Sequence, residues 1–528
     1  MSKLLRRANK RISLSGAATL LVAASILGQL LGFFRTKLIN ANFPAYGPES
    51  TDAFFAAFKI PDFFFFTIAA GALGVAFMPF LADRLEKGDK NGMWELTDSL
   101  LNLLAILTGI VGILILVFAR PLIQNVVAPD LSPEQLNNAV AIMRLIALNP
   151  MLFTISGILT SAQQTLGRFF FYAIAPLFYN MSIIAGIFLF KDSFGLVGAG
   201  IGACIGGVLQ LIIVALGMYG TGFKYYPKIM WRRSEFKQIV RQLPARSVDQ
   251  GLDSLNSIVE TNFAARLGPG NITFYENAYL LHTAPILLIG TTISTAAFPR
   301  LTERLAQNRS DLFRKDFLEV LRVMIWITIP VMVVAFFSRA YLARLIYAKG
   351  SPEIATILGF LVGAIFFRTI FALISRWFYA QKDTATPLYV SLFAIGLNIT
   401  LAYTLTQHSS YGIAGLAMAQ SIAAAIEVFV LCCIMVYRDR KLLDSDFWNA
   451  MLKVVAVTGF TVVAADITTN LIPLQLSDVG LFVLGFKLVG ITAITFSIHL
   501  ALSHVMGLEE PRPVLRKLRS MALKTVRL

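Results

Sequence analysis

Apolar stretches of about 20 residues follow one another along most of the chain and are separated by short polar loops, and this is the length that a helix needs to cross a membrane. A membrane span must satisfy its own backbone hydrogen bonds, which a helix does, and the alternating pattern of a barrel strand is absent. The pattern therefore predicts an all-α polytopic membrane protein with about 14 transmembrane helices. The expected spans are 14–38, 52–82, 98–118, 136–162, 170–190, 195–218, 243–267, 273–298, 318–338, 354–376, 387–406, 411–436, 449–471 and 478–505.

The sequence also contains an internal repeat, in which segments of its first half match segments of its second half. Asp52 and Pro61, in TDAFFAAFKIP, match Glu276 and Pro285, in YENAYLLHTAP, at one common offset. Further matches are Gln163 with Gln381, Asn180 with Asn398, and GLVGAGIGA from Gly195 with GIAGLAMAQ from Gly412. Shared hydrophobicity is the alternative explanation, but it does not account for the matching polar and proline positions. Parallel repeats of this kind are a transporter architecture, with the substrate path between the halves.

The duplication predicts three parts. An N-terminal six-helix lobe covers 1–222, and a second, parallel six-helix lobe covers 223–445. Residues 446–528 lie outside the repeat and hold two further transmembrane helices and a basic cytoplasmic tail.

Composition and charge support a membrane protein rather than a nucleic-acid-binding protein. The chain is 56% hydrophobic and only 14% charged, whereas soluble domains carry about a quarter charged residues. The net charge of +16 could suggest nucleic acid, but roughly thirty Lys and Arg lie on alternate loops and termini and about six on the other loops. This asymmetry is the positive-inside signal, so we expect both termini in the cytoplasm, no nucleic-acid partner, and attraction to anionic lipid headgroups.

Ionisable side chains at membrane depth are costly and usually face a cavity or a partner. The expected spans 1, 2, 7 and 8 are the polar ones, and the duplication makes these spans symmetry equivalents. In span 7, residues Asp249, Asp253, Asn256 and Glu260 share one helical face. We therefore expect a water-filled central cavity.

Each candidate residue has an alternative explanation. Arg35 and Lys59 have the chemistry to bind a phosphate or pyrophosphate, although both could instead extend to the membrane interface. Asp52 could cap the helix of span 2 instead of binding a ligand. Glu260 with Asn398 could form a small-cation site or an ordinary interhelical hydrogen bond. We expect no cofactor and no metal, with a coupling monovalent cation as the one ion to consider.

Sequence motifs for catalysis are absent. The chain has no G-x-x-x-x-G-K-[ST], no H-E-x-x-H and no G-x-S-x-G. We therefore expect a non-enzyme that does not use ATP directly. Transport would be driven by an ion gradient or by the membrane potential, which is worth about 2.3 kcal/mol per charge per 100 mV.

Several segments resemble the MurJ (MviN) family of lipid II flippases, within the multidrug/oligosaccharidyl-lipid/polysaccharide exporter superfamily. The likeness extends in order over nearly the whole chain. Its carriers are LGFFRTKL at 31–38, TDAFFAAFKIPDF at 51–63, LTSAQQTLGRFFFYAIAPLFYN at 159–180, AAFPRL at 296–301, FYAQKDTATP at 378–387 and GIAGLAMA at 412–419.

The resemblance implies a fourteen-helix exporter in the bacterial cytoplasmic (inner) membrane. Such a protein would carry lipid II, the undecaprenyl-pyrophosphate-linked peptidoglycan precursor, from the inner to the outer leaflet by alternating access, and we expect a monomer. Arg35, Asp52 and Lys59 match family positions in spans 1 and 2, and Glu260 matches an acid of span 7. Gln29 stands where the family has an arginine, and we include it among the substrate-binding candidates.

Three other functions fit parts of the sequence: an exporter of another polyprenyl-linked glycan, a drug/cation antiporter, and a non-transporting membrane scaffold for cell-wall enzymes. The Arg35 and Lys59 pair favours an anionic lipid headgroup over a cationic drug. Phe65 and Phe66 stand where the family has basic residues, and this loss of positive charge favours the scaffold.

Overall fold

The computed structural model describes residues 14–70, 77–347, 350–407, 411–512 and 515–516. Throughout these ranges the only regular elements are helices, which confirms the all-α prediction. The chain divides into two compact units, Met1–Thr273 and Phe274–Leu528, and each is described by itself. This division places residues 223–273 with the first unit. Compactness and internal repetition are different properties, so the lobe boundaries predicted from the duplication stay a prediction.

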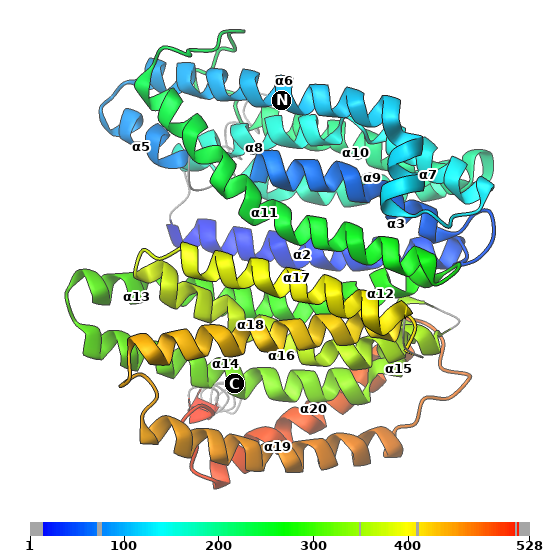
Figure 1. Cartoon of the computed structure of the whole chain (residues 1–528), viewed down its shortest axis with the longest axis vertical. Helices are drawn as coiled ribbons and strands as arrows, with labels where there is room; N and C mark the ends of the chain where they lie inside the picture. The colour runs from blue at the N-terminus through cyan, green and yellow to red at the C-terminus, as the bar shows by residue number, and fades with distance from the viewer. Residues whose placement is uncertain (1–13, 71–76, 348–349, 408–410, 513–514, 517–528) are drawn as a thin grey trace, which may run out of the picture. The chain divides into compact units, whose positions relative to one another are not determined.

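The first unit is a bundle in which α9 packs along α2 and α10, and α8 packs along α6 and α10 (Figure 1). Its helices are α2 (Leu14–Asn42), α3 (Thr51–Phe64), η1 (Phe65–Ala70), α5 (Met78–Glu86), α6 (Lys90–Leu122), η2 (Ile123–Val127), α7 (Pro133–Leu145), α8 (Asn149–Thr165), α9 (Phe170–Phe194), α10 (Val197–Leu216) and α11 (Ser234–Arg266).

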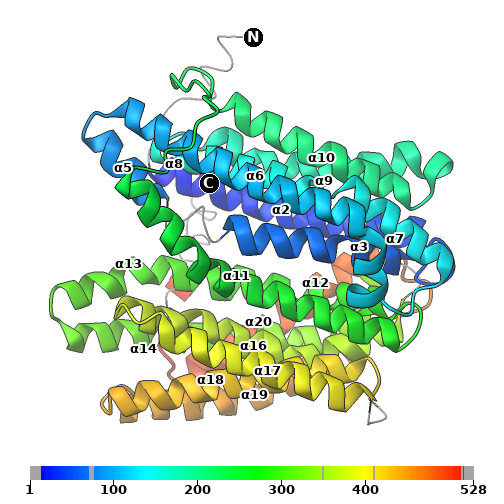
Figure 2. The ribbon, with the colours of Figure 1, turned by 45° about the horizontal axis from the view of Figure 1, so that its top comes forward.

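The second unit is a bundle in which α16 packs against α14 and α18, while α17 packs against α18 and α19 against α20 (Figure 2). Its helices are α12 (Asn271–Pro285), which begins in the last residues of the first unit, η3 (Ile286–Thr291), α13 (Thr292–Ala306), α14 (Ser310–Phe337), α15 (Arg339–Ile346), α16 (Pro352–Ala380), α17 (Ala385–Gln407), α18 (Ala414–Arg438), α19 (Ser445–Leu471) and α20 (Leu481–Val505).

Twelve helical segments of the described chain are long and apolar enough to cross a membrane, and they coincide with twelve of the predicted spans. The other two predicted spans, 52–82 and 243–267, fall on α3 with its neighbours and on α11. Charged residues in these helices, such as Lys59 and Glu260, lower their hydropathy. The exact count of 14 is therefore approximate.

Apolar residues on α6 separate into a buried face and an exposed face. Val111, Ile115 and Ala119, four residues apart, are buried. Ile110, Ile113 and Val117 are between 52% and 60% exposed. An apolar face of this kind is unfavourable in water and favourable against acyl chains, as expected of a membrane helix.

Both units change helix geometry after the matched prolines. Pro61 lies inside α3, which continues into the π-helical turn η1, and Pro285 ends α12, which continues into η3. Proline lacks an N–H and removes one bond of the helix ladder, so a local change of winding is expected. Its occurrence at corresponding positions supports the duplication.

The matched glycines support it as well. Gly195 and Gly412 both have left-handed backbones, with φ of +55° and +52°, and each stands two residues before a helix, α10 or α18. Three residues later, Gly198 lies against the backbone of Phe190, and Gly415 against that of Leu405. Each unit thus holds a hairpin of two closely packed helices at the same position of the repeat.

Gly195→Ala should destabilise the protein more than Gly412→Ala. Both substitutions place an L side chain in the left-handed region, at a cost of about 1–2 kcal/mol. A Cβ at position 195 would also lie 2.3 Å from Oε1 of Glu49, whose carboxylate accepts a hydrogen bond from the Leu196 N–H, whereas at 412 it meets no described atom within 4 Å. Thermal unfolding of both variants in one detergent tests this, and equal shifts of the midpoint would contradict it.

Candidate functional site

Arg35 is held inside the helical bundle of the first unit. It lies in α2, and its Nη1 donates to Oδ1 of Asn180 in α9 at 3.0 Å. Its Nε–H is buried and has no acceptor among the described residues. The side chain is therefore directed at a neighbouring helix, and its hydrogen-bonding capacity is only partly used.

A closely packed pocket, with no room for a water molecule, lies beside this contact. Asp62 of α3, Asn149 of α8 and Tyr179 of α9 supply its polar lining, and Tyr179 and Asn149 are hydrogen-bonded. Asp62 and Tyr179 both interact electrostatically with Arg35. The first unit thus assembles a basic, an acidic and a phenolic group from three helices at one place.

Lys59 and Glu260 both lie where α3 meets α11. Lys59 donates from Nζ to Oγ of Ser257 in α11 at 2.8 Å. The preceding residue, Asn256, donates to Oε1 of Glu260, one turn further along α11, at 2.9 Å. Asn256 and Glu260 are buried, whereas Asp253 is exposed. The side chain of Asp249 lies outside the described residues. Three of the four residues of the predicted polar face therefore have described side chains, and two of these are buried against neighbours.

Asp52 joins the start of α3 to the start of α12. Its carboxylate accepts from the Gly270 N–H at 2.6 Å, from the Thr273 N–H at 2.7 Å and from the Thr273 hydroxyl at 2.6 Å, and the residue is 1% exposed. The N-cap of α3 itself is Ser50, which accepts from the Asp52 N–H. The prediction that Asp52 caps α3 was therefore wrong. Asp52 does act as a cap, but for the start of α12.

Gln29 and Asn398 are the remaining candidates. Gln29 is exposed on α2. Asn398 is buried in α17, which belongs to the second unit, while Glu260 belongs to the first. The pairing of Glu260 with Asn398 stays a prediction.

The second unit contains a buried ion pair to which the sequence assigned no role. Arg368 of α16 donates from Nη1 to Oε2 of Glu427 in α18 at 3.1 Å, and the hydroxyl of Ser391 in α17 donates to Oε1 at 2.6 Å. Glu427 is 1% exposed, and His282 of α12 is buried within electrostatic reach of Arg368. An acid and a base in separate predicted spans were the available signal, but a pairing across helices cannot be deduced from one sequence.

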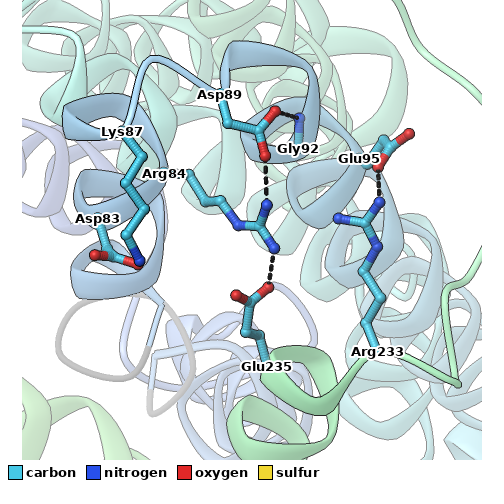
Figure 3. Close-up of polar contacts among 8 residues, drawn as sticks. All are labelled: Asp83, Arg84, Lys87, Asp89, Gly92, Glu95, Arg233 and Glu235. Carbon is cyan, nitrogen blue, oxygen red and sulfur yellow. Dashed lines mark hydrogen bonds and ion pairs between the residues drawn. The ribbon is translucent and has the colours of Figure 1, made fainter.

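One end of the first unit is fastened by an ionic network. Figure 3 shows the guanidinium of Arg84, in α5, between the carboxylates of Asp89 and Glu235, with Arg233 bonded to Glu95 beside it. Hydrogen bonds from the Gly92 N–H and from Arg84 lower the pKa of Asp89 below its usual value. The network ties the loop between α5 and α6 to the start of α11.

The segment that leads to α11 is also bound along α6. Backbone groups of this segment meet polar side chains of α6: the Tyr226 N–H donates to Asp98, the Met230 N–H to Ser99, and Asn102 donates to the Tyr226 and Lys228 carbonyls. These polar residues of the third predicted span therefore hold the connection between the repeats.

The motif FYAQKDTATP forms the junction between α16 and α17. Lys382 has a left-handed backbone with φ of +63°, and Asp383 accepts from the Thr386 N–H and hydroxyl at 3.0 and 2.6 Å. Arg438 donates to the same carboxylate at 2.7 Å. The residues of this motif therefore have a structural role at the α16–α17 junction.

Asp383→Asn should lower stability by an amount that does not vary between pH 5 and 8. Partial burial opposes ionisation, but hydrogen bonds from Thr386 and Arg438 outweigh it and lower the pKa of Asp383 to about 2. A depressed pKa stabilises the fold above the unfolded value near 4, and this contribution is lost as the pH falls towards 2. We expect a loss of about 1 kcal/mol that shrinks below pH 4, measured by thermal unfolding across pH. A loss that changes between pH 6 and 8 would contradict it.

Twelve apolar helical segments of the described chain, with ionisable side chains among the helices, define an all-α polytopic membrane protein. The sequence model of the family described as "Lipid II flippase MurJ" matches residues 48–489, which is more than half of the chain. The chain therefore belongs to the MurJ family, as the sequence motifs indicated.

Individual relatives agree with this assignment. A "Probable lipid II flippase MurJ" of Borreliella burgdorferi is 25% identical over 80% of this chain and 83% of its own length, and one of Rhizobium meliloti is 23% identical over 92% of each. A solved structure titled "Lipid II flippase MurJ, inward closed conformation" has a TM-score of 0.75 at 22% identity and covers 92% of this chain and 98% of that one. An inward-facing multidrug resistance transporter of the MATE family has a TM-score of 0.63 at 17% identity, over 83% and 98% of the two chains. These two structural matches concern the fold alone.

Proposed function

We propose that this protein moves lipid II from the inner to the outer leaflet of the bacterial cytoplasmic membrane by alternating access, with both termini in the cytoplasm and without catalysing a chemical reaction. Membership of the MurJ family supports the substrate class. The single structural observation that carries the proposal is Arg35, a cation held within the helical bundle by Asn180, with an unused N–H. A guanidinium in this state suits a phosphate group.

Lys59 and Arg35 would share the binding of the diphosphate. Arg35 supplies a planar fork that can contact two oxygens, and Lys59 supplies a point charge that Ser257 orients. Asp52 would hold the helix that carries Lys59 rather than contact the ligand. Gln29, exposed on the same helix as Arg35, can offer an amide to the headgroup.

The membrane potential can drive this direction of transport. The interior of a bacterium is negative, so the free energy of an anionic headgroup falls as it moves outward, by about 2.3 kcal/mol per charge per 100 mV. A monovalent cation bound by Glu260, with Asn398 as the other candidate ligand, would provide a second source of coupling, and we propose it as a binding candidate only.

A depletion and rescue experiment tests the proposed function. The chain is expressed in cells from which their own lipid II flippase has been depleted, and lipid II accessible from outside is measured. We expect growth and outward lipid II to be restored. Failure of both, with the protein present in the membrane at normal level, would exclude lipid II flipping, and drug resistance without rescue would favour an antiporter.

A further inference from the structure

A cavity of about 760 Å³ lies in the second unit, at the starts of α14 and α19. These two helices pack against each other (Figure 1), and the segment that follows α20 completes the wall of the cavity. The lining residues lie just before or in the first turns of the predicted spans 318–338 and 449–471, or just after the predicted span 478–505. The cavity is therefore expected at the level where these helices enter the membrane.

A charged pair forms the most buried part of this cavity. Arg322 of α14 donates from Nε to Oε1 of Glu510 at 2.6 Å, and Glu510 is only 5% exposed. The other carboxylate oxygen, Oε2, is buried and has no donor among the described residues. The two Nη groups of Arg322 have no acceptor in the same part of the chain. Because buried polar groups are normally hydrogen-bonded, this pair can accept one further donor at Glu510 and one further acceptor at Arg322.

The whole lining of the cavity carries charges of both signs. Six carboxylates and four basic side chains contribute to it, although the chain as a whole has a net charge of +16. Two of the basic side chains, Lys315 and Lys441, are exposed. A purely anionic ligand would meet an excess of carboxylates, and a purely cationic ligand would leave the Arg322 fork unused. The lining therefore suits a ligand that carries an ammonium and a phosphate together.

Apolar side chains next to the charges indicate that this ligand is a lipid. Leu318, Val323 and Phe447 are part of the lining. Directly after Phe447, Trp448 is 56% exposed, and one turn further along α19 Leu452 is 68% exposed. A tryptophan beside an exposed apolar surface is typical of the boundary between membrane and water. Acyl chains can therefore lie next to a headgroup that occupies the cavity.

We propose that this cavity binds the headgroup of an ethanolamine phospholipid. The ammonium would donate to Oε2 of Glu510, while the phosphate would accept from the Nη groups of Arg322 and from Lys441. Such a lipid would join α14, α19 and the segment after α20 as a resident component of the second unit. The inference does not depend on lipid II transport, so a failed rescue experiment would leave it standing.

Native mass spectrometry of the full-length protein in detergent tests this proposal. The protein is titrated with phosphatidylethanolamine, phosphatidylcholine and phosphatidylglycerol that have the same acyl chains. Phosphatidylcholine has the same charges as phosphatidylethanolamine, but its trimethylated nitrogen cannot donate a hydrogen bond. We expect one phosphatidylethanolamine to bind about tenfold more tightly than phosphatidylcholine, because a hydrogen bond to the Glu510 carboxylate is charge-assisted. Equal affinities, or tighter binding of phosphatidylglycerol, would overturn the proposal.

Variants assign the two halves of the headgroup to their partners. Glu510→Gln should lose most of the preference for phosphatidylethanolamine over phosphatidylcholine. Lys441→Ala should weaken both lipids about two- to threefold and keep the preference, since both carry the phosphate. Asp130→Asn, in the exposed loop before α7, is the matched control and should bind as the wild type does. A preference that survives Glu510→Gln would exclude this cavity as the site.

A soluble competitor separates a lipid from a free metabolite. O-Phosphoethanolamine carries the same ammonium and phosphate without acyl chains, and it is added at the concentration of the bound lipid. We expect it to displace little phosphatidylethanolamine, because the acyl chains contribute to binding. Displacement of half of the lipid would show that the cavity serves a soluble ligand and would overturn the assignment to a phospholipid.

Discussion

Replacing Arg35 with alanine should abolish rescue in flippase-depleted cells. The guanidinium makes a 3.0 Å hydrogen bond to Asn180 and has an unused N–H inside the helical bundle. A charge-assisted hydrogen bond to a ligand is worth about 1.5–3 kcal/mol, so the rate of outward movement should fall about ten- to hundredfold. The measurement is the amount of externally accessible lipid II over time, normalised to protein in the membrane.

The controls separate binding from folding. Arg120→Ala removes an exposed arginine at the end of α6 that contacts Asn137, and it should leave rescue intact. Arg35→Lys keeps the charge but loses the fork, so we expect partial rescue. If Arg35→Ala rescues as well as Arg120→Ala, Arg35 does not bind the transported lipid.

Replacing Asp52 with alanine should give the largest loss of stability of any substitution considered for this chain. The carboxylate is 1% exposed and accepts three hydrogen bonds, from the Gly270 N–H and from the N–H and hydroxyl of Thr273. Alanine would leave these donors buried without acceptors, at about 3–5 kcal/mol in total. The expected result is a strongly lowered midpoint of thermal unfolding in detergent.

Ser50→Ala provides the matched comparison for Asp52. Ser50 is also fully buried at the start of α3, but it caps only its own helix, so its loss should cost about 1 kcal/mol. Asp52→Asn keeps one acceptor oxygen and should fall between the two variants. A loss for Asp52→Ala no larger than that for Ser50→Ala would show that the tie to α12 contributes little.

Most of the helical fold could be predicted because each membrane-spanning helix requires a continuous run of apolar residues, and such a run can be recognised from the local sequence alone. Each of the twelve apolar helices lies where a run of apolar residues predicts it. The helices α3 and α11 were harder to judge, because Lys59 and Glu260 reduce their apolar character, and each is held by a hydrogen bond to a neutral side chain of α11. The duplication was detectable because prolines and glycines, whose backbone demands are specific, recur at matching positions.

The site could be predicted only as a set of residue types. Arg35 and Lys59 were identifiable as cations inside spans, but their partners Asn180 and Ser257 lie 145 and 198 residues away in sequence. Asp52 was recognised as a possible cap, yet its target lies more than 200 residues away. Arg368 and Glu427 drew no attention because each is an isolated charge until α16 and α18 pack together.

The contact between the glycines of α9 and α10 has a practical consequence for measuring motion. A Cβ at Gly186 would lie 2.6 Å from the Cα of Gly202, so these backbones touch and the hairpin has no room to slide or rotate. Spin labels placed on the exposed faces of α9 and α10 should therefore report one constant separation throughout the transport cycle. The distance between these two labels can serve as an internal reference for distances measured elsewhere in the protein.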